Sequence, residues 1–535
     1  MKTKVRIRKP VFITMALFYI IAILAGVISP DTFSAVQAAI VDFSCYWFGW
    51  LYHAVILAMV IMCLWIIFSK RAGGIRLGGQ NAKPIMSKWN WFAITLCGGI
   101  ATGIVFWGIA EPVTHFMDPI PNMGYEALTH EGATMALSTC YLHWAFTQYS
   151  AFTIAGVAIG LATYNLKLPY RISSALYPIF GKKVMGGIGT VVDLLCLFGL
   201  AGGVSSSLGE CALQIGAGLG ILDIVQPSAM VWLVILVTVV IAFLLSSYTG
   251  IGKGVRFLSD CNAKIYIGML IFIVIVGPTR LILSLTFESL GVHTSEFFHQ
   301  MTYLGAYNNE QWSTWWTLNY WCWTIAYMFL LGMFFAKIAR GRTLREFVSI
   351  NMLLPGAFNV IWFGVFGSAA IDIERSVGGL WDAMNELGTE ASVFLFFEHF
   401  PLSKIMSVIF LITVFLSVVT LADSMTTTIS SLSIVQNDAS TTEPPAKIKI
   451  FWGLAISSLS LVNIITAAIV GNVSSIDAVK SLAIVSAFPL LFLAVILIVS
   501  TVKMIVQYDK YDTVDHPETS VVDPECIVDI DIAEA

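Results

Sequence analysis

Apolar residues along the chain gather into runs of about 20 residues, separated by shorter polar segments. A helix needs about 20 apolar residues to cross the hydrocarbon core of a bilayer. The pattern therefore predicts twelve membrane-spanning helices, which we number as spans one to twelve. Their expected limits are 11–28, 45–68, 91–110, 134–162, 188–221, 228–247, 262–285, 314–338, 347–371, 403–434, 449–470 and 476–502. Span one is expected to be retained, because no clear cleavage site follows it.

The segments between the spans predict the orientation. Lys and Arg collect in alternate segments, around 70–88, 167–183, 253–256, 337–345 and 447–449, while the intervening segments are acidic or neutral. Basic residues favour the cytoplasmic side, so we expect a multi-pass plasma membrane protein, in bacteria of the inner membrane, with both termini cytoplasmic. The loop 286–313 carries Phe297 and Phe298 and predicts an external interfacial helix. The acidic segment 507–535 predicts a disordered cytoplasmic tail.

Composition agrees with a bilayer as solvent, since 57% of the residues are hydrophobic and only 12% are charged, against about a quarter in soluble proteins. The net charge of -4 and the scattered basic residues exclude nucleic acid as an expected partner. The nine cysteines are spread singly and predict neither a disulfide framework nor a zinc site. Without a recognisable catalytic motif in this sequence, we expect a carrier and not a membrane enzyme.

Span eight carries a stripe of aromatic residues on one helical face: Trp312, Trp316, Tyr320, Trp323 and Tyr327. Trp312 fits an interfacial belt, whereas Trp323 and Tyr327 lie three to four turns further along, beyond the headgroups. Aromatic faces in a low-dielectric site bind quaternary ammonium groups by cation–π attraction. The alternative for this stripe is core packing against neighbouring helices.

Span four offers a second aromatic set, Trp144, Tyr149 and Phe152, spread over about 140° of the helical wheel. The set could curl around a ligand, and core packing is again the alternative. His143 beside it is expected to be a satisfied buried histidine.

Glycines and charges inside the spans are the other candidate features. The run from Cys97 to Gly103 in span three predicts either an interrupted helix that exposes backbone carbonyls or close helix packing. Charged residues within spans are functional candidates because burying them is costly. Asp260 and Lys264 are spaced to pair with each other. Asp423 is a candidate for helix-to-helix hydrogen bonding, ion-site support or proton coupling, in that order. The charged candidates are Asp193, Glu210, Asp260, Lys264, Arg280 and Asp423.

Several runs resemble the betaine/choline/carnitine transporter (BCCT) family. They are WTLNYWCW from Trp316 to Trp323, FFAKIARGRTLREF from Phe334 to Phe347, GIVFWGIAEP from Gly103 to Pro112, His143-Trp144, and GIGKGVRFLSD from Gly250 to Asp260. They occur in the family's order and cover the chain from about residue 45 to 500.

The resemblance implies an all-α membrane protein of the leucine-transporter-like fold, with two inverted five-helix repeats. The implied divisions are 1–90 with spans one and two, 91–285 as the first repeat, 286–313 as the external segment, 314–506 as the second repeat, and 507–535 as the tail. It also implies a homotrimer that carries a small onium substrate in an aromatic box. That box is implied at Trp144, Tyr149, Phe152, Trp316, Trp323, Thr324 and Tyr327.

The chain departs from the family pattern at several of these positions. Thr324, Tyr149 and Phe152 stand where the family has Trp, Trp and Tyr, so the box is thinner. In sodium-coupled members the span three backbone near Cys97 and Ile100 faces span ten hydroxyls; Thr420 is kept here, but Leu421 replaces a serine. The carnitine and γ-butyrobetaine antiporters share that leucine but have an arginine at the position of Asn262. The ion-coupling candidates are Cys97, Ile100, Asn262, Thr420 and Asp423.

The sequence therefore predicts a secondary transporter of a quaternary ammonium compound such as betaine, choline, carnitine or γ-butyrobetaine, with sodium as the single candidate ion and no other cofactor. The alternative is a sodium-coupled symporter of another zwitterion or an amino acid on the same fold. A channel would require a ring of like residues at one depth, which the sequence does not suggest.

Overall fold

The computed structural model describes residues 7–99, 101–249, 256–307, 310–435, 444–470 and 475–528. Within them the regular secondary structure is helical, apart from isolated bridges at Ile7 with Ile434 and Arg76 with Thr343. Eleven helical segments in this part of the chain are long and apolar enough to cross a membrane. The expected all-α, multi-pass class is confirmed.

Most helices follow the predicted spans closely, because each apolar run sets the length of its helix; span two is the exception, since its helix begins at Pro30 and not at 45. Their bounds are α1 (Lys9–Ile28), α2 (Pro30–Phe68), α3 (Lys70–Gly74), α4 (Lys88–Gly99), α5 (Ala101–Met117), α6 (His130–Trp144), α7 (Phe146–Gly160), α8 (Tyr177–Phe180), α9 (Gly187–Ile221), α10 (Ala229–Thr249), α11 (Arg256–Val276), α12 (Thr279–Thr302), α13 (Trp312–Trp315), α14 (Thr317–Ile338), α15 (Leu344–Val348), α16 (Leu354–Ser376), α17 (Leu380–Leu387), α18 (Ser392–Glu398), α19 (Ser403–Leu432), α20 (Ala446–Val470), α21 (Ser475–Val506) and α22 (Tyr508–Tyr511).

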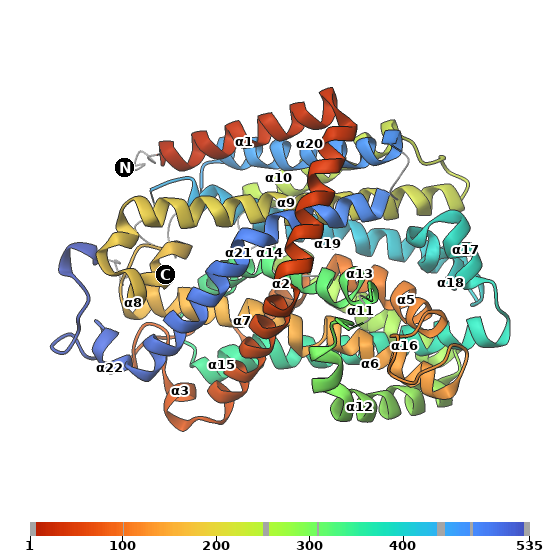
Figure 1. The fold of residues 1–535 in the computed structure, drawn as a ribbon, viewed down its shortest axis with the longest axis horizontal. Coiled ribbons are helices and arrows are strands. Elements are labelled where there is room, and N and C mark those ends of the chain that lie inside the picture. The colour runs from red at the N-terminus through yellow and green to blue at the C-terminus, as the bar shows by residue number, and fades with distance from the viewer. Residues whose placement is uncertain are drawn as a thin grey trace.

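The long helices pack into one bundle around α7, α9 and α14. In Figure 1, α1 and α20 lie side by side along one edge, α2 and α21 run obliquely across the bundle, and α12 lies at the opposite edge. Helices α7 and α14 are packed together most extensively, and α9 lies against α14, α19 and α21. Aromatic residues of spans four and eight therefore face each other in the centre of the molecule.

Span three corresponds to α4 and α5, which flank residue 100. The run from Cys97 to Gly103, for which an interrupted helix or close packing was expected, contains residue 100, which lies outside the described part of the chain. The helix continues to Met117, seven residues past the expected end at 110. The expected limit was wrong because the continuation contains the polar residues Glu111, Thr114 and His115, which are buried in the bundle.

The expected division of 262–285 and 286–313 is also corrected. Span seven is α11, which ends at Val276, and a new helix, α12, begins at Thr279. Pro278 separates them, because proline lacks an N–H and disfavours helical geometry in the residue before it. A helix was expected here and is present, although it starts earlier than predicted; its external position remains a prediction. The grouping of the spans into two inverted repeats remains a prediction.

The prediction of a disordered tail is wrong for residues 507–528. This segment forms backbone hydrogen bonds to the connection that follows α7, with Thr513 N donating to Asn165 O at 2.9 Å and Val528 N donating to Lys167 O at 2.9 Å. An acidic composition favours disorder in a segment that finds no partner. Here Asp509 and Glu525 of the tail pair with Arg71 and Lys182.

Candidate functional site

A cavity lies where α5, α6, α9, α13 and α14 meet. It is lined by Trp107, Trp144, Glu210, Trp315, Trp316, Asn319, Tyr320 and Trp323. The cavity has a volume of about 20 Å³. One water needs roughly 10–15 Å³. The cavity thus admits about one water as it stands, and an organic ligand requires its aromatic walls to move apart.

A break in span four places Trp144 in this cavity. Helix α6 ends at Trp144, Ala145 has φ −90° and ψ −118°, and α7 starts at Phe146. The carbonyl of Trp144 accepts a hydrogen bond from the Asn359 amide at 2.6 Å, so the freed backbone group is satisfied inside the protein. The Trp144 ring lies over Gly103, where a Cβ would approach it to 2.6 Å. The glycine at 103 is therefore explained by close packing of this ring.

A second break, at Trp316, starts the helix that carries the other aromatic wall. Trp316 has φ −114° and ψ −90°, between the short α13 and α14. From α14, Trp323 reaches the Trp144 ring with centroids 6.1 Å apart, and Tyr320 reaches it at 5.1 Å. The indole nitrogen of Trp323 is buried and has no hydrogen-bond partner. An unpartnered buried donor beside a cavity is costly and points to a group that it meets when the cavity is occupied.

A single carboxylate, Glu111 of α5, holds this aromatic wall from behind. Its Oε2 accepts hydrogen bonds from Trp144 Nε1 at 2.5 Å and Tyr320 Oη at 2.6 Å. Its Oε1 lies 2.6 Å from His143 Nδ1 and 3.2 Å from His115 Nε2. The side chain is fully buried. Bonds to a charged group are about twice as strong as neutral ones, so Glu111 fixes two walls of the cavity at once.

The same cluster contains a set of metal-ligand types, since ligand atoms of Glu111, His115 and His143 lie within 4.8 Å of one another. His143 uses both ring nitrogens, because Nε2 lies 2.9 Å from Thr317 Oγ1. The geometry is therefore that of a hydrogen-bonded network that ties α5, α6 and α14 together. His143 is a satisfied buried histidine, as expected.

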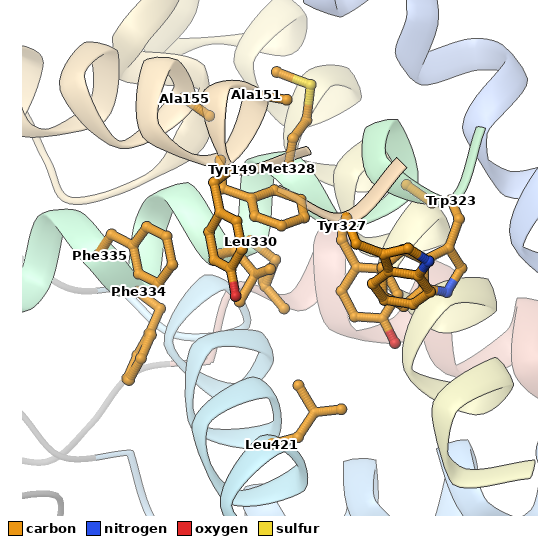
Figure 2. Packing of buried hydrophobic residues seen from close by; sticks show 14 of the residues in the cluster. Tyr149, Ala151, Ala155, Trp323, Tyr327, Met328, Leu330, Phe334, Phe335 and Leu421 are labelled. Carbon is orange, nitrogen blue, oxygen red and sulfur yellow. The ribbon is translucent and has the colours of Figure 1, made fainter. Parts of the chain in front are cut away.

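The predicted box residues fall into two groups. Trp144, Trp316 and Trp323 line the cavity, and Tyr327 packs on Trp323 with centroids 4.7 Å apart. Figure 2 shows Tyr149 apart from Trp323 and Tyr327, on the other side of the view.

Tyr149 and Phe152 form a separate buried pair on α7, with centroids 6.0 Å apart. Thr324 is fully buried, and its hydroxyl has no hydrogen-bond partner. The structure therefore does not bring all seven predicted residues around one cavity.

Trp312 is not the exposed belt residue that the stripe predicted. Its side chain is only 6% exposed and packs with Ile120 and Met135. Its ring centroid lies 5.3 Å from that of His115. The following turn brings Trp315 to the surface instead, at 56% exposure. The break at Trp316 changes the helical phase, so the wheel angles calculated for one continuous helix do not hold across it.

A family model for betaine/carnitine/choline family transporters matches residues 10–510, almost the whole chain. The chain belongs to the BCCT family. Its members are transporters, so the protein is a transporter and not an enzyme. The match also confirms the resemblance carried by the motifs of spans three, four and eight.

Curated relatives agree with this assignment. The glycine betaine transporter OpuD of Bacillus subtilis (strain 168) is 32% identical over 482 residues, covering 90% of this chain and 91% of that protein. An ectoine/hydroxyectoine transporter of Virgibacillus pantothenticus is 30% identical, covering 95% and 98%.

The osmo-dependent choline transporter BetT2 of Acinetobacter baylyi (strain ATCC 33305 / BD413 / ADP1) is 30% identical, covering 91% and 70%. A solved structure of a substrate-bound, outward-open Na⁺-coupled sialic acid symporter covers 82% of this chain and 84% of its own, at 13% identity and a TM-score of 0.38. That likeness is too remote to bear on the fold or on the ion.

The ion-coupling candidates of this BCCT transporter lie on α4, α11 and α19, which pack against one another. The Cys97 thiol lies 3.4 Å from Ser259 O. Asn262 Nδ2 donates to Ser417 Oγ at 2.9 Å, and its buried Oδ1 has no partner. The Thr420 hydroxyl donates to Leu416 O of its own helix at 2.8 Å. Ile100 lies outside the described residues.

Four of the six charged candidates inside the spans have identified partners. Asp423 accepts a hydrogen bond from Ser246 Oγ at 2.7 Å, which joins α10 to α19, the role ranked first for it. Asp260 and Lys264 pair at 2.6 Å, as their spacing predicts. Asp193 pairs with Arg8 at 2.8 Å.

Trp107, which lines the cavity, and Glu111, which holds its wall, were not among the predicted site residues. Trp107 faces Trp316 with centroids 6.1 Å apart. Both residues lie in the GIVFWGIAEP run, which was used only for the resemblance. Glu111 is a charged residue at the end of an apolar span, and charged residues within spans are the signal that singled out Asp423 and the other charged candidates. It was passed over because the span was ended one residue before it, at 110.

Proposed function

We propose that this transporter carries a quaternary ammonium compound by alternating access, with the onium group held in the aromatic cavity between α6 and α14. The main support for this proposal is the composition of that cavity, whose walls include five tryptophans and a tyrosine. Each aromatic face contributes roughly 0.5–2 kcal/mol to binding a desolvated cation. The relatives named for glycine betaine and for choline support this substrate class.

The small volume of the cavity fits a carrier in a closed state. Alternating access moves groups of helices relative to each other around a fixed site. Movement of α6, which carries Trp144, away from α14 would open the cavity, and the adjoining α7 would bring Tyr149 and Phe152 toward the substrate. We keep these two residues in the proposed box on that basis, together with Thr324 and Tyr327.

Uptake into proteoliposomes tests the proposal. Labelled choline, glycine betaine, carnitine and γ-butyrobetaine are compared, and at least one must be accumulated or exchanged. Trp323→Ala should weaken binding by about 1–3 kcal/mol, or roughly 5- to 150-fold. Trp50→Ala is the control, because Trp50 lies on α2 and is 58% exposed. Equal effects of the two substitutions would exclude the cavity as the substrate site.

For coupling, we propose weak sodium dependence. A hard cation requires several oxygen ligands, and Asn262 Oδ1 with the Thr420 hydroxyl supplies some of them, while Leu421 supplies none. We also propose that the termini are cytoplasmic and that the protein is a homotrimer in the plasma membrane. Mass measurement in detergent and reporter fusions at each terminus test these two points.

A further inference from the structure

One face of α16 holds the break in span four. Gly356, Asn359 and Phe363 are spaced three and four residues apart, so they share this face. A Cβ at Gly356 would approach the Phe146 ring to 2.5 Å, and the Phe363 ring stacks on that of Trp144 with centroids 5.8 Å apart. Asn359 lies between these two contacts, at the break itself.

Only part of the Asn359 side chain is used there. Its Nδ2 donates to the Trp144 carbonyl at 2.6 Å, and a carbonyl can only accept, which fixes the orientation of the amide. Its Oδ1 is buried and has no hydrogen-bond partner among the described residues. Because the side chain is fully buried, this acceptor is costly as it stands and indicates a donor that reaches it in another state of the protein.

Tyr149 supplies a matching donor. Its side chain is fully buried, and its hydroxyl also has no hydrogen-bond partner in the part of the chain that the structure describes. It lies within reach of Asn359, on α7, one turn past the break. A phenol donates one hydrogen and an amide oxygen accepts, so the two groups are complementary. They are close without being hydrogen-bonded, and a small shift of α7 against α16 would join them.

Opening of the cavity supplies such a shift. Trp144 and Tyr149 lie on opposite sides of the break at Ala145, and both belong to the proposed box. Trp144 is fixed to α16 through its carbonyl and its ring, so we expect it to move with that helix. Tyr149 follows α7, and its position relative to α16 changes when the angle at the break changes. Asn359 is therefore placed to fix both aromatic side chains around a substrate.

We infer that Asn359 is a positioning residue of the substrate site: its Nδ2 holds Trp144, and its Oδ1 accepts the Tyr149 hydroxyl when substrate is bound. The inference rests on the proposed function and names the contact that completes the aromatic box. Asn359 is not among the described residues that line the cavity, and it acts through the two aromatic residues.

Tetramethylammonium, choline and glycine betaine serve as probes, because each contains the quaternary ammonium group. Their binding to the full-length protein in detergent is measured by titration calorimetry, and the thermal midpoint is recorded with and without probe. Tyr149→Phe removes the donor, and Asn359→Leu removes both groups of the amide at similar volume. Tyr141→Phe is the matched control, because Tyr141 on α6 is also buried and its hydroxyl likewise has no partner among the described residues.

Tyr149→Phe should weaken probe binding about fivefold, the effect of one hydrogen bond. It should leave the midpoint of the probe-free protein unchanged, because the hydroxyl is unpaired before substrate binds; a purely structural tyrosine would change the midpoint and not the affinity. Asn359→Leu should weaken binding about tenfold or more. In the Asn359→Leu background, Tyr149→Phe should have no further effect, because its acceptor is absent. Tyr141→Phe should change neither quantity.

Failure of the proposed function and failure of this inference give different results. If wild-type protein binds none of the three probes, the proposed function is wrong and the inference falls with it. If it binds a probe and Tyr149→Phe binds that probe as tightly, or if Tyr149→Phe and Asn359→Leu act additively, the function stands and the role of Asn359 is wrong. Should Asn359→Leu not fold, Asn359→Ser, which is too short to reach both partners, takes its place and is judged by the same two results.

Discussion

The hydrogen bond from Tyr320 to Glu111 gives the sharpest test of how the cavity wall is held. Tyr320→Phe removes only the phenol oxygen, which lies 2.6 Å from Glu111 Oε2 in a buried position. The ring keeps its packing, with centroids 5.1 Å from Trp144 and 4.6 Å from His143. A hydrogen bond to a charged group contributes about 1.5–3 kcal/mol. We expect a loss of stability of that size.

Thermal unfolding in detergent, followed by intrinsic fluorescence, measures this loss. In a chain of this length about 1 kcal/mol shifts the midpoint by roughly 2 °C or less, so Tyr320→Phe should lower it by about 2–6 °C. Tyr141→Phe is the matched control, because the buried Tyr141 hydroxyl has no hydrogen-bond partner and its removal should cost little or nothing.

A double-mutant cycle shows whether the effect passes through Glu111. Glu111→Ala leaves four buried donors without their acceptor and should cost more than Tyr320→Phe, about 3–5 kcal/mol. In the Glu111→Ala background, Tyr320→Phe should then cost under about 0.5 kcal/mol, because its partner is already absent. Additive losses, or a Tyr320→Phe protein that unfolds at the wild-type midpoint, would refute the role given to this carboxylate.

Three further predictions concern other parts of the molecule. Leu421→Ser should strengthen the effect of sodium on uptake, which in wild-type protein should stay below about tenfold, or 1.4 kcal/mol; transport that requires sodium, or a Leu421→Ser response equal to wild type, would contradict this. Gly79→Ala should release the tail and increase its cleavage by added protease, because Gly79 has φ +87° and its new Cβ would meet Val514 at 2.6 Å; unchanged cleavage would count against tail docking. Arg8→Ala should lower the unfolding midpoint because it leaves the buried Asp193 without its ion pair, at a cost of about 3–5 kcal/mol, and Asp193→Asn should restore part of the loss; no change in midpoint would show that the pair is dispensable.

The spans could be predicted from the sequence because a bilayer imposes a length on each apolar run, and this is a local property. Nine of the twelve expected spans needed only small changes in their limits, whereas the start at 45 and the ends at 110 and 285 were wrong. At 110 the helix continues through Glu111 and His115, polar residues that the bundle satisfies. At 285 the expected span ran through Pro278, which instead separates α11 from α12.

The aromatic residues of the site were visible in the sequence, but their grouping was not. A helical wheel assumes one continuous helix, and the breaks at Ala145 and Trp316 rotate the residues on either side of them. No glycine or proline marks either break. They persist because tertiary partners, such as Asn359 at the Trp144 carbonyl, satisfy the freed backbone.

By itself the sequence determined that the chain is a multi-pass helical protein of the BCCT family with an aromatic stripe in span eight, since hydropathy and local motifs carry that information. Only the tertiary structure decided which aromatics share a cavity, that Glu111 holds two of them, and that Glu210 faces the same space. These three facts depend on the contact of α5, α6, α9 and α14, segments separated by up to about two hundred residues. The docked tail depends on partners still more distant in the chain, and no local pattern records such pairings.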